Sequence, residues 1–366
     1  MKTLPNIFFL RFLLATLVVI YHIPETSHRL GFPSFRALPI FDKGSLAVYY
    51  FFTVSGFLVI RNLYLENENK GMIDIKKFYL RRIGRLWPVY FVVITIGVIL
   101  YHFLLPLFEI PFETNYSLSK LLLYYLAFIP NIFNEIYKVG GVLNIVWSIG
   151  IEEQFYLVAP VILYIFRSKI VLTLSLILAA LLITLFVYPE FYKYSNFYFY
   201  FASGGLMAIL CEKKIFNLSG TFINAALVLL FAVSFVTDVF DFTNKPLFHL
   251  FHMALSALVI CSIAYFPIFK VQNKKLNYLG EISYGIYMYH MIVVVGYFFI
   301  LNKLNMKIIF NDTLSIVFNN LIILSITFIV SHLSHKYFES LFYKKHIKET
   351  IVETKEIEEQ KFKATA

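Results

Sequence analysis

The stretch IVLTLSLILAALLITLFVY (residues 170–188) contains no charged side chain. About 20 consecutive apolar residues span the hydrocarbon layer of a membrane as a helix, so this stretch predicts a transmembrane helix. The whole chain has the same character, because 59% of its 366 residues are hydrophobic and only 15% are charged. Soluble domains have about 25% charged residues. The composition therefore predicts an all-α, polytopic membrane protein.

Eleven apolar segments can be drawn along the chain, at 6–24, 45–63, 87–107, 118–131, 147–166, 170–188, 197–211, 221–238, 248–266, 282–300 and 314–334. Basic residues cluster between them at 61–85, 167–169, 213–214 and 270–275, and again after residue 336. Loops retained in the cytoplasm are enriched in Lys and Arg. All these clusters lie on the same side of the membrane only if segment 118–131 does not cross it. We therefore expect about ten transmembrane helices, a short re-entrant or interfacial helix at 118–131, and both termini in the cytoplasm.

Composition also predicts the domain organisation and the kinds of partner. Residues 1–343 are expected to form one membrane domain in the plasma (inner) membrane, and residues 344–366 a charged, disordered cytoplasmic tail. The formal net charge of +10 lies largely in the loops, so we expect membrane lipid rather than nucleic acid as a partner. Cys211 and Cys261 lie in separate apolar runs, and we expect neither a disulfide nor a metal site.

The first apolar segment carries two ionisable side chains, Arg11 and His22. Ionisable groups inside membrane spans are costly and usually functional. A separation of eleven residues completes about three helical turns, so the two side chains share one face, roughly 16 Å apart along the axis. They line a path across much of the bilayer, or Arg11 snorkels to the inner headgroups while His22 sits at the outer interface. Spacing alone leaves both interpretations open.

Two acidic residues interrupt the apolar stretch WSIGIEEQFY, which begins at Trp147. Ser148 and Glu152 share a helix face, whereas Glu153 points about 100° away. We expect Glu152 to face the same partner as Ser148 and to be functional. Glu153 fits better as a charged outer cap of the span, stabilised by the helix N-terminus.

A cluster of arginines lies in FYLRRIGRLWP (residues 78–88), at Arg81, Arg82 and Arg85. The planar guanidinium group binds phosphate well through its fork of donors. Membrane topology and contact with anionic lipid explain the cluster better on sequence alone.

Two more stretches place polar or small residues in apolar spans. Ser55 and Gly56 in FFTVSGFL permit close approach of a ligand or, more simply, of another helix. In GEISYGIYMYH, Ser283, Tyr287 and His290 follow i, i+4, i+7 spacing and make a polar stripe on one helix face. His290 is equally well explained as a buried histidine satisfied by a neighbouring helix.

In this order, the motifs resemble those of the acyltransferase-3 family of integral membrane proteins, which O-acylate carbohydrates and other envelope molecules. The matching features are Arg11 with His22, FFTVSGFL, Arg82-x-x-Arg85, WSIGIEEQFY and GEISYGIYMYH. Ser331 and Glu339 resemble the family's last-helix Ser and the Glu after it. Here Glu339 is followed by Ser-Leu-Phe, which departs from the family's usual ending of that helix.

The resemblance implies that an acyl group, usually acetyl, passes from cytoplasmic acyl-CoA to a hydroxyl on the outer side. It implies a catalytic role for His22 and donor binding by Arg11, Arg82 and Arg85, with no metal. Arg81, Ser55 and Gly56 are further candidates for donor binding. The candidates for lining the channel or supporting the site are Trp147, Ser148, Ser283, Tyr284 and His290.

We expect His22 to act as the general base, with Glu152 orienting it or stabilising its cation. An acyl-histidine intermediate stays open as a second route. The expected acceptor is a surface or lipid-linked glycan. The rival functions are a multi-span transporter or flippase, and a non-catalytic exporter of acylated product.

Overall fold

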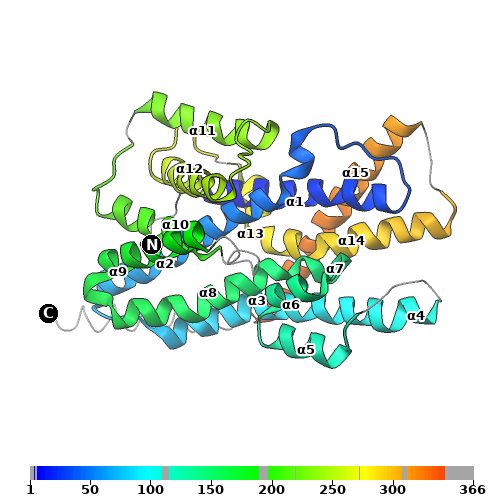
Figure 1. The fold of residues 1–366 in the computed structure, drawn as a ribbon, viewed down its shortest axis with the longest axis horizontal. Coiled ribbons are helices and arrows are strands. Elements are labelled where there is room, and N and C mark those ends of the chain that lie inside the picture. Colours follow the sequence, from blue (N-terminus) through cyan, green and yellow to red (C-terminus); the bar gives the residue numbers. More distant parts are fainter. Residues whose placement is uncertain are drawn as a thin grey trace.

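The computed structural model describes residue 4 and residues 6–108, 115–188, 197–218, 220–271, 273–306 and 311–342. Over these residues the fold is a bundle of helices without strands, which confirms the all-α prediction (Figure 1). The predicted tail, residues 344–366, lies outside the described part of the chain.

The helices follow the predicted apolar segments closely. They are α1 (Ile7–Arg29), η1 (Pro39–Asp42), α2 (Gly44–Lys70), α3 (Ile75–Ile99), η2 (Leu100–Leu104), α4 (Leu105–Leu107), α5 (Leu118–Leu126), α6 (Pro130–Tyr137), α7 (Gly141–Asn144), α8 (Val146–Ile165), η3 (Arg167–Lys169), α9 (Ile170–Val187), α10 (Tyr198–Glu212), α11 (Thr221–Val236), α12 (Lys245–Tyr265), α13 (Lys274–Glu281), α14 (Ser283–Lys303), α15 (Asp312–Leu333) and η5 (Ser334–Glu339).

Eight helical segments within the described ranges are long and apolar enough to cross a membrane. They are Ile7–Arg29, Gly44–Lys70, Ile75–Leu107, Gly141–Ile165, Arg167–Val187, Lys245–Tyr265, Ser283–Lys303 and Asp312–Phe342. The apolar helices α10 and α11 have 15 and 16 residues. At 1.5 Å per residue they reach roughly 22–24 Å, against a hydrocarbon layer of about 30 Å. The chain is thus a multi-pass membrane protein, and ten spans stay a prediction that requires both short helices to cross.

Segment 118–131 is divided between α5 and the start of α6. The break falls at residues 127–129, where Phe128 adopts a left-handed φ of 57°. The nine residues of α5 extend only about 14 Å, too short to span. This agrees with the prediction of a short re-entrant or interfacial helix.

The interior and the perimeter of the bundle differ in burial. In their most apolar windows, α2 and α14 are 72% and 67% buried, whereas α9 and α15 are 17% and 22% buried. Lipid covers apolar side chains at the perimeter, so those helices need few protein contacts. α1 packs against both of these more buried helices, α2 and α14 (Figure 1).

Small residues let α2 and α10 approach each other closely. A Cβ atom at Gly56 would lie 2.1 Å from the Phe201 carbonyl oxygen, and one at Gly204 would lie 2.2 Å from that of Thr53. Glycines at a helix crossing in a membrane allow this backbone contact. The structure therefore assigns Gly56 to helix packing.

The expectation that the two cysteines stay unpaired is wrong. Cys211 of α10 and Cys261 of α12 form a disulfide across a sequence separation of 50 residues. α10 packs against α12, and this packing brings the two runs together. Which helices are neighbours could not be read from the spacing of the cysteines.

Candidate functional site

A cavity of about 170 Å³ lies between α1, α2, α3, α8 and α14. Its polar lining comes from Arg11, Ser55, Asn62, Arg82, Arg85, Ser148, Glu152, Tyr156, Ser283, Tyr284 and Tyr287. We call this cavity the arginine pocket. Residues from five helices and from most of the predicted motifs meet there, although they are spread over much of the chain.

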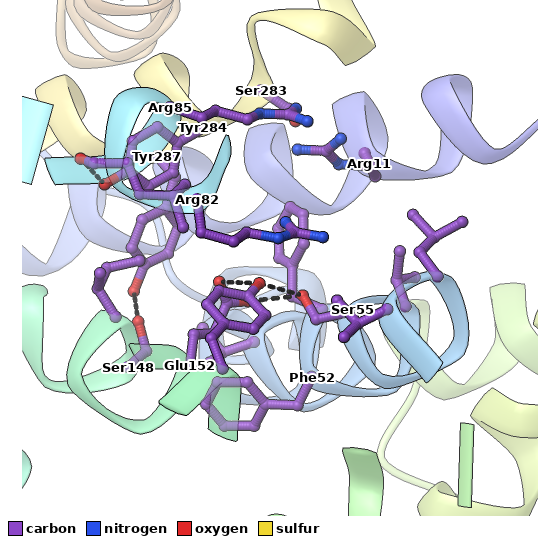
Figure 2. Close-up of a pocket in the computed structure, with 18 of the residues that line it drawn as sticks. Arg11, Phe52, Ser55, Arg82, Arg85, Ser148, Glu152, Ser283, Tyr284 and Tyr287 are labelled. Atoms are coloured by element: carbon purple, nitrogen blue, oxygen red, sulfur yellow. Dashed lines mark hydrogen bonds between the residues drawn. The ribbon is translucent and has the colours of Figure 1, made fainter. Parts of the chain in front are cut away.

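Three guanidinium groups dominate the arginine pocket. Arg11 comes from α1, and Arg82 and Arg85 come from the first half of α3; their guanidinium groups converge on the same space (Figure 2). The guanidinium carbon of Arg82 lies 4.8 Å from the centre of the Tyr156 ring, a cation–π contact. One carboxylate, Glu152, opposes these three cations in the lining. The excess of positive charge in a partly enclosed space suits an anionic ligand.

Glu152 is held on the wall of the arginine pocket by two hydroxyl groups. Ser55 donates to Oε1 at 2.9 Å, and Tyr156 donates to Oε2 at 3.0 Å. Arg11 and Arg82 lie close enough to interact with the carboxylate electrostatically. Ser55, from a predicted donor-binding motif, therefore meets Glu152 directly (Figure 2).

The predicted polar stripe of α14 forms another wall. The Tyr287 hydroxyl lies 2.6 Å from Ser148 Oγ, and the Tyr284 hydroxyl donates to the Leu86 carbonyl at 2.9 Å. Ser283 lines the pocket with a buried hydroxyl that has no hydrogen-bond partner among the described residues. A buried hydroxyl without a partner is costly, so Ser283 is a ready contact for a polar ligand.

His22 lies in a separate cluster farther along α1. Its Nδ1 is 3.1 Å from Glu25 Oε2, and its ring centre is 5.1 Å from that of His290 on α14. We call His22 and His290 the histidine pair. The His290 ring centre also lies 5.7 Å from that of Tyr287, which lines the arginine pocket. One stripe of α14 therefore connects the two clusters.

The predicted pairing of His22 with Glu152 is wrong. The carboxylate beside His22 belongs to Glu25, one turn farther along α1, whereas Glu152 is bound by Ser55 and Tyr156. Residues three apart on a helix are neighbours, so the spacing of His22 and Glu25 could have revealed the contact. Glu25 lies one residue beyond the apolar segment 6–24, and the predicted site therefore did not include it.

Besides the histidine pair, three predicted site residues do not line the arginine pocket. Gly56 faces the backbone of α10, and Arg81 is exposed on the surface of α3. Trp147 packs edge-on against Phe52, with ring centres 6.1 Å apart. Their neighbours in sequence, Ser55, Arg82 and Ser148, carry the polar groups that reach the cavity.

The expectation that Glu153 is a charged outer cap of the span is also wrong. Its side chain is buried, and its Oε2 accepts a hydrogen bond from Trp87 Nε1 at 3.2 Å. The adjacent Gln154 donates to the Phe128 carbonyl at 2.8 Å. The start of α8 is therefore enclosed by α3 and by the α5–α6 turn, and water does not reach the Glu153 carboxyl there.

Comparison with known proteins gives consistent matches over most of the chain. A family model described as an acyltransferase domain matches residues 5–334. The peptidoglycan O-acetyltransferase of Listeria monocytogenes is 26% identical over 80% of this chain and 50% of that protein. A putative O-acetyltransferase of Staphylococcus aureus is 25% identical over 95% of this chain and 58% of that protein.

A third relative comes from a virus. A putative acetyltransferase of Acidianus two-tailed virus is 27% identical over 70% of this chain and 75% of that protein. The chain spans only about half the length of the two bacterial relatives. No solved structure matches the chain.

Proposed function

The chain belongs to the acyltransferase family whose domain it matches, and from this premise we propose that it moves an acetyl group from cytoplasmic acetyl-CoA to a glycan hydroxyl outside the plasma membrane. One observation carries the proposal. The arginine pocket and the histidine pair lie on one stripe of α1, roughly 16 Å apart along its axis. Both bacterial relatives are described as O-acetyltransferases, which supports acetyl as the group, and the Listeria relative is described as acting on peptidoglycan, which supports a glycan as the acceptor.

Acetyl-CoA has a highly charged phosphate end and a long, thin arm that ends in the thioester. Three guanidinium groups against one carboxylate suit its phosphates. We place the nucleotide at the cytoplasmic mouth beside Arg82 and Arg85, and the arm along α14 toward His22.

The chemistry requires a base near the thioester. Glu25 accepts a hydrogen bond from the His22 Nδ1–H group, which fixes the ring and leaves Nε2 to take the proton of the acceptor hydroxyl. The deprotonated oxygen attacks the acetyl carbonyl, and the C–S bond breaks. An acetyl-His22 intermediate is the second route to the same product.

The test uses the full chain purified into proteoliposomes. Acetyl-CoA is supplied on one side and soluble peptidoglycan fragments on the other, and mass spectrometry follows O-acetylation while a thiol reagent follows released coenzyme A. We expect both products with the wild-type protein and neither with His22→Ala. Release of coenzyme A and glycan acetylation that persist in folded His22→Ala protein would overturn the proposed base. Flux of a substrate without thioester cleavage would favour a transporter.

A further inference from the structure

The proposed function gives His290 no chemical role, yet its surroundings are unusual. Its imidazole is fully buried, and its Nδ1 is hydrogen-bonded to the carbonyl of Tyr287 in the preceding turn. That bond fixes the Nδ1–H tautomer, so Nε2 carries the lone pair. Nε2 has no hydrogen-bond partner among the described residues. A buried acceptor left unpaired costs free energy unless something occupies it during function.

The nearest ionisable ring to His290 is that of His22, with the ring centres 5.1 Å apart and the planes inclined by 32°. Glu25 is the carboxylate that faces the pair, from α1. Two imidazolium cations this close repel each other in a low-dielectric interior, so the pair holds one proton at a time. His290 is thus placed to receive the proton that His22 has taken up.

His290 also lies closer to the arginine pocket than His22 does. Ser283 and Arg11 both line the pocket. His290 follows Ser283 by seven residues, or about 10 Å of helix, whereas His22 follows Arg11 by roughly 16 Å. The His290 ring centre also lies 5.7 Å from that of Tyr287, whose side chain lines the pocket, so His290 is in contact with both the pocket wall and His22.

We propose that His290 relays the proton from His22 to the departing thiolate of the donor. This inference rests on the proposed acetyl transfer. The O–H bond of the acceptor breaks as His22 Nε2 takes the proton, and the new C–O bond forms as the C–S bond breaks. The electron pair of that bond stays on sulfur. The proton passes from His22 to His290 Nε2 and then to sulfur, so the net products are an ester and a thiol.

The decisive test changes the leaving group and keeps the rest of the donor. His290→Gln has a side chain of similar reach that cannot carry a proton. Acetyl-CoA releases a thiolate that benefits from a proton, whereas acetyl-seleno-coenzyme A, with selenium in place of sulfur, releases a selenolate that is stable without one. Both donors are given to the same proteoliposomes with soluble peptidoglycan fragments as the acceptor.

We expect His290→Gln to lower kcat with acetyl-CoA by about 10²–10⁴-fold, the range of general acid–base catalysis, and to lower it less than tenfold with the selenoester. The affinity for coenzyme A should not change. His28→Gln, at an exposed histidine of α1, the helix that carries His22, is the control and should behave as the wild type.

Two results would overturn the relay. Equal losses with both donors mean that His290 only supports the fold, and an unchanged kcat with acetyl-CoA means that it has no part in the reaction. Failure of the proposed function itself looks different, because the wild-type protein would then cleave neither donor. His22→Ala should lose acetyl transfer from both donors, whereas His290→Gln should lose it with acetyl-CoA alone. This difference distinguishes the base from the relay.

Discussion

Two ionisable side chains of helix α1, Arg11 and His22, have surroundings that differ in charge. Arg11 faces a cavity that holds two further guanidinium groups, whereas His22 lies between a carboxylate, Glu25, and a second imidazole, His290. The first setting suits the holding of an anion, and the second suits the movement of a proton. In the proposed function, one face of α1 therefore separates donor binding from acyl transfer by roughly 16 Å.

Polar neighbours allow both the arginine pocket and the histidine pair to exist inside a membrane. Glu152, Ser55 and Tyr156 provide hydrogen bonds and an opposite charge beside the arginines. Glu25 does the same for His22. Buried charges are tolerated when they are paired or hydrogen-bonded. Of these two clusters, the arginine pocket keeps an excess of positive charge, and an anionic donor would neutralise that excess.

The largest expected effect is at the histidine pair. His22→Ala removes the proposed base, so kcat for acetyl transfer should fall by about 10²–10⁴-fold, while the Kd for acetyl-CoA should stay unchanged. Coenzyme A release in the presence of soluble peptidoglycan fragments measures kcat. His28→Ala, exposed on the same helix, should retain activity. Weaker binding of acetyl-CoA in His22→Ala would mean that the two clusters do not divide binding from chemistry.

The next effect is at the arginine pocket, where neighbouring arginines give a matched pair of variants. Arg82→Gln removes a cation that lines the cavity, and Arg81→Gln removes an exposed one. A hydrogen bond to a charged group contributes about 1.5–3 kcal/mol, so the KM for acetyl-CoA should rise about 10–100-fold in Arg82→Gln. It should hardly change in Arg81→Gln. The same rise in both variants would point to general attraction of anions to the surface.

The two carboxylates sharpen the contrast further. Glu25→Gln weakens the orientation of His22, and we expect about a tenfold loss of kcat with unchanged donor binding. Glu152→Gln removes the one negative charge from the arginine pocket, so acetyl-CoA should bind at least as tightly as before. Initial rates over a range of acetyl-CoA concentrations separate the two effects. A larger fall of kcat in Glu152→Gln than in Glu25→Gln would contradict the proposed role of Glu25 in orienting His22.

The smallest effect on activity is expected at Gly56, which distinguishes packing from ligand contact. Gly56→Ala forces a Cβ atom against the α10 backbone and should destabilise the fold by about 1–3 kcal/mol, seen as a lower Tm in detergent. Gly296→Ala, a glycine of α14 with no atom within 4 Å of its Cβ position, should not lower the Tm. If Gly56→Ala instead changed the KM for acetyl-CoA without changing the Tm, Gly56 would contact the donor rather than serve helix packing.

Much of this arrangement could be predicted from local spacing. The shared face of Arg11 and His22, and the stripe from Ser283 to His290, follow from helical periodicity and reappear in the structure. The contact between His22 and Glu25 was within reach of the same reasoning. These features depend on one helix at a time.

Features that depend on neighbouring helices could not be predicted in this way. The disulfide between Cys211 and Cys261, the packing of Gly56 on α10 and the hydrogen bond from Ser55 to Glu152 each join separate helices. Apolar periodicity in a membrane span marks a helix, but lipid and protein are both apolar neighbours. Periodicity therefore does not say which face meets which helix.

The central claim is that the arginine pocket binds the donor and the histidine pair carries out the chemistry. Its most direct test is the equilibrium Kd of acetyl-CoA for purified wild-type, His22→Ala and Arg82→Gln proteins, measured by titration without an acceptor. We predict the same Kd for wild type and His22→Ala, and a Kd about 10–100-fold higher for Arg82→Gln. Weakened binding in His22→Ala together with unchanged binding in Arg82→Gln would contradict the account.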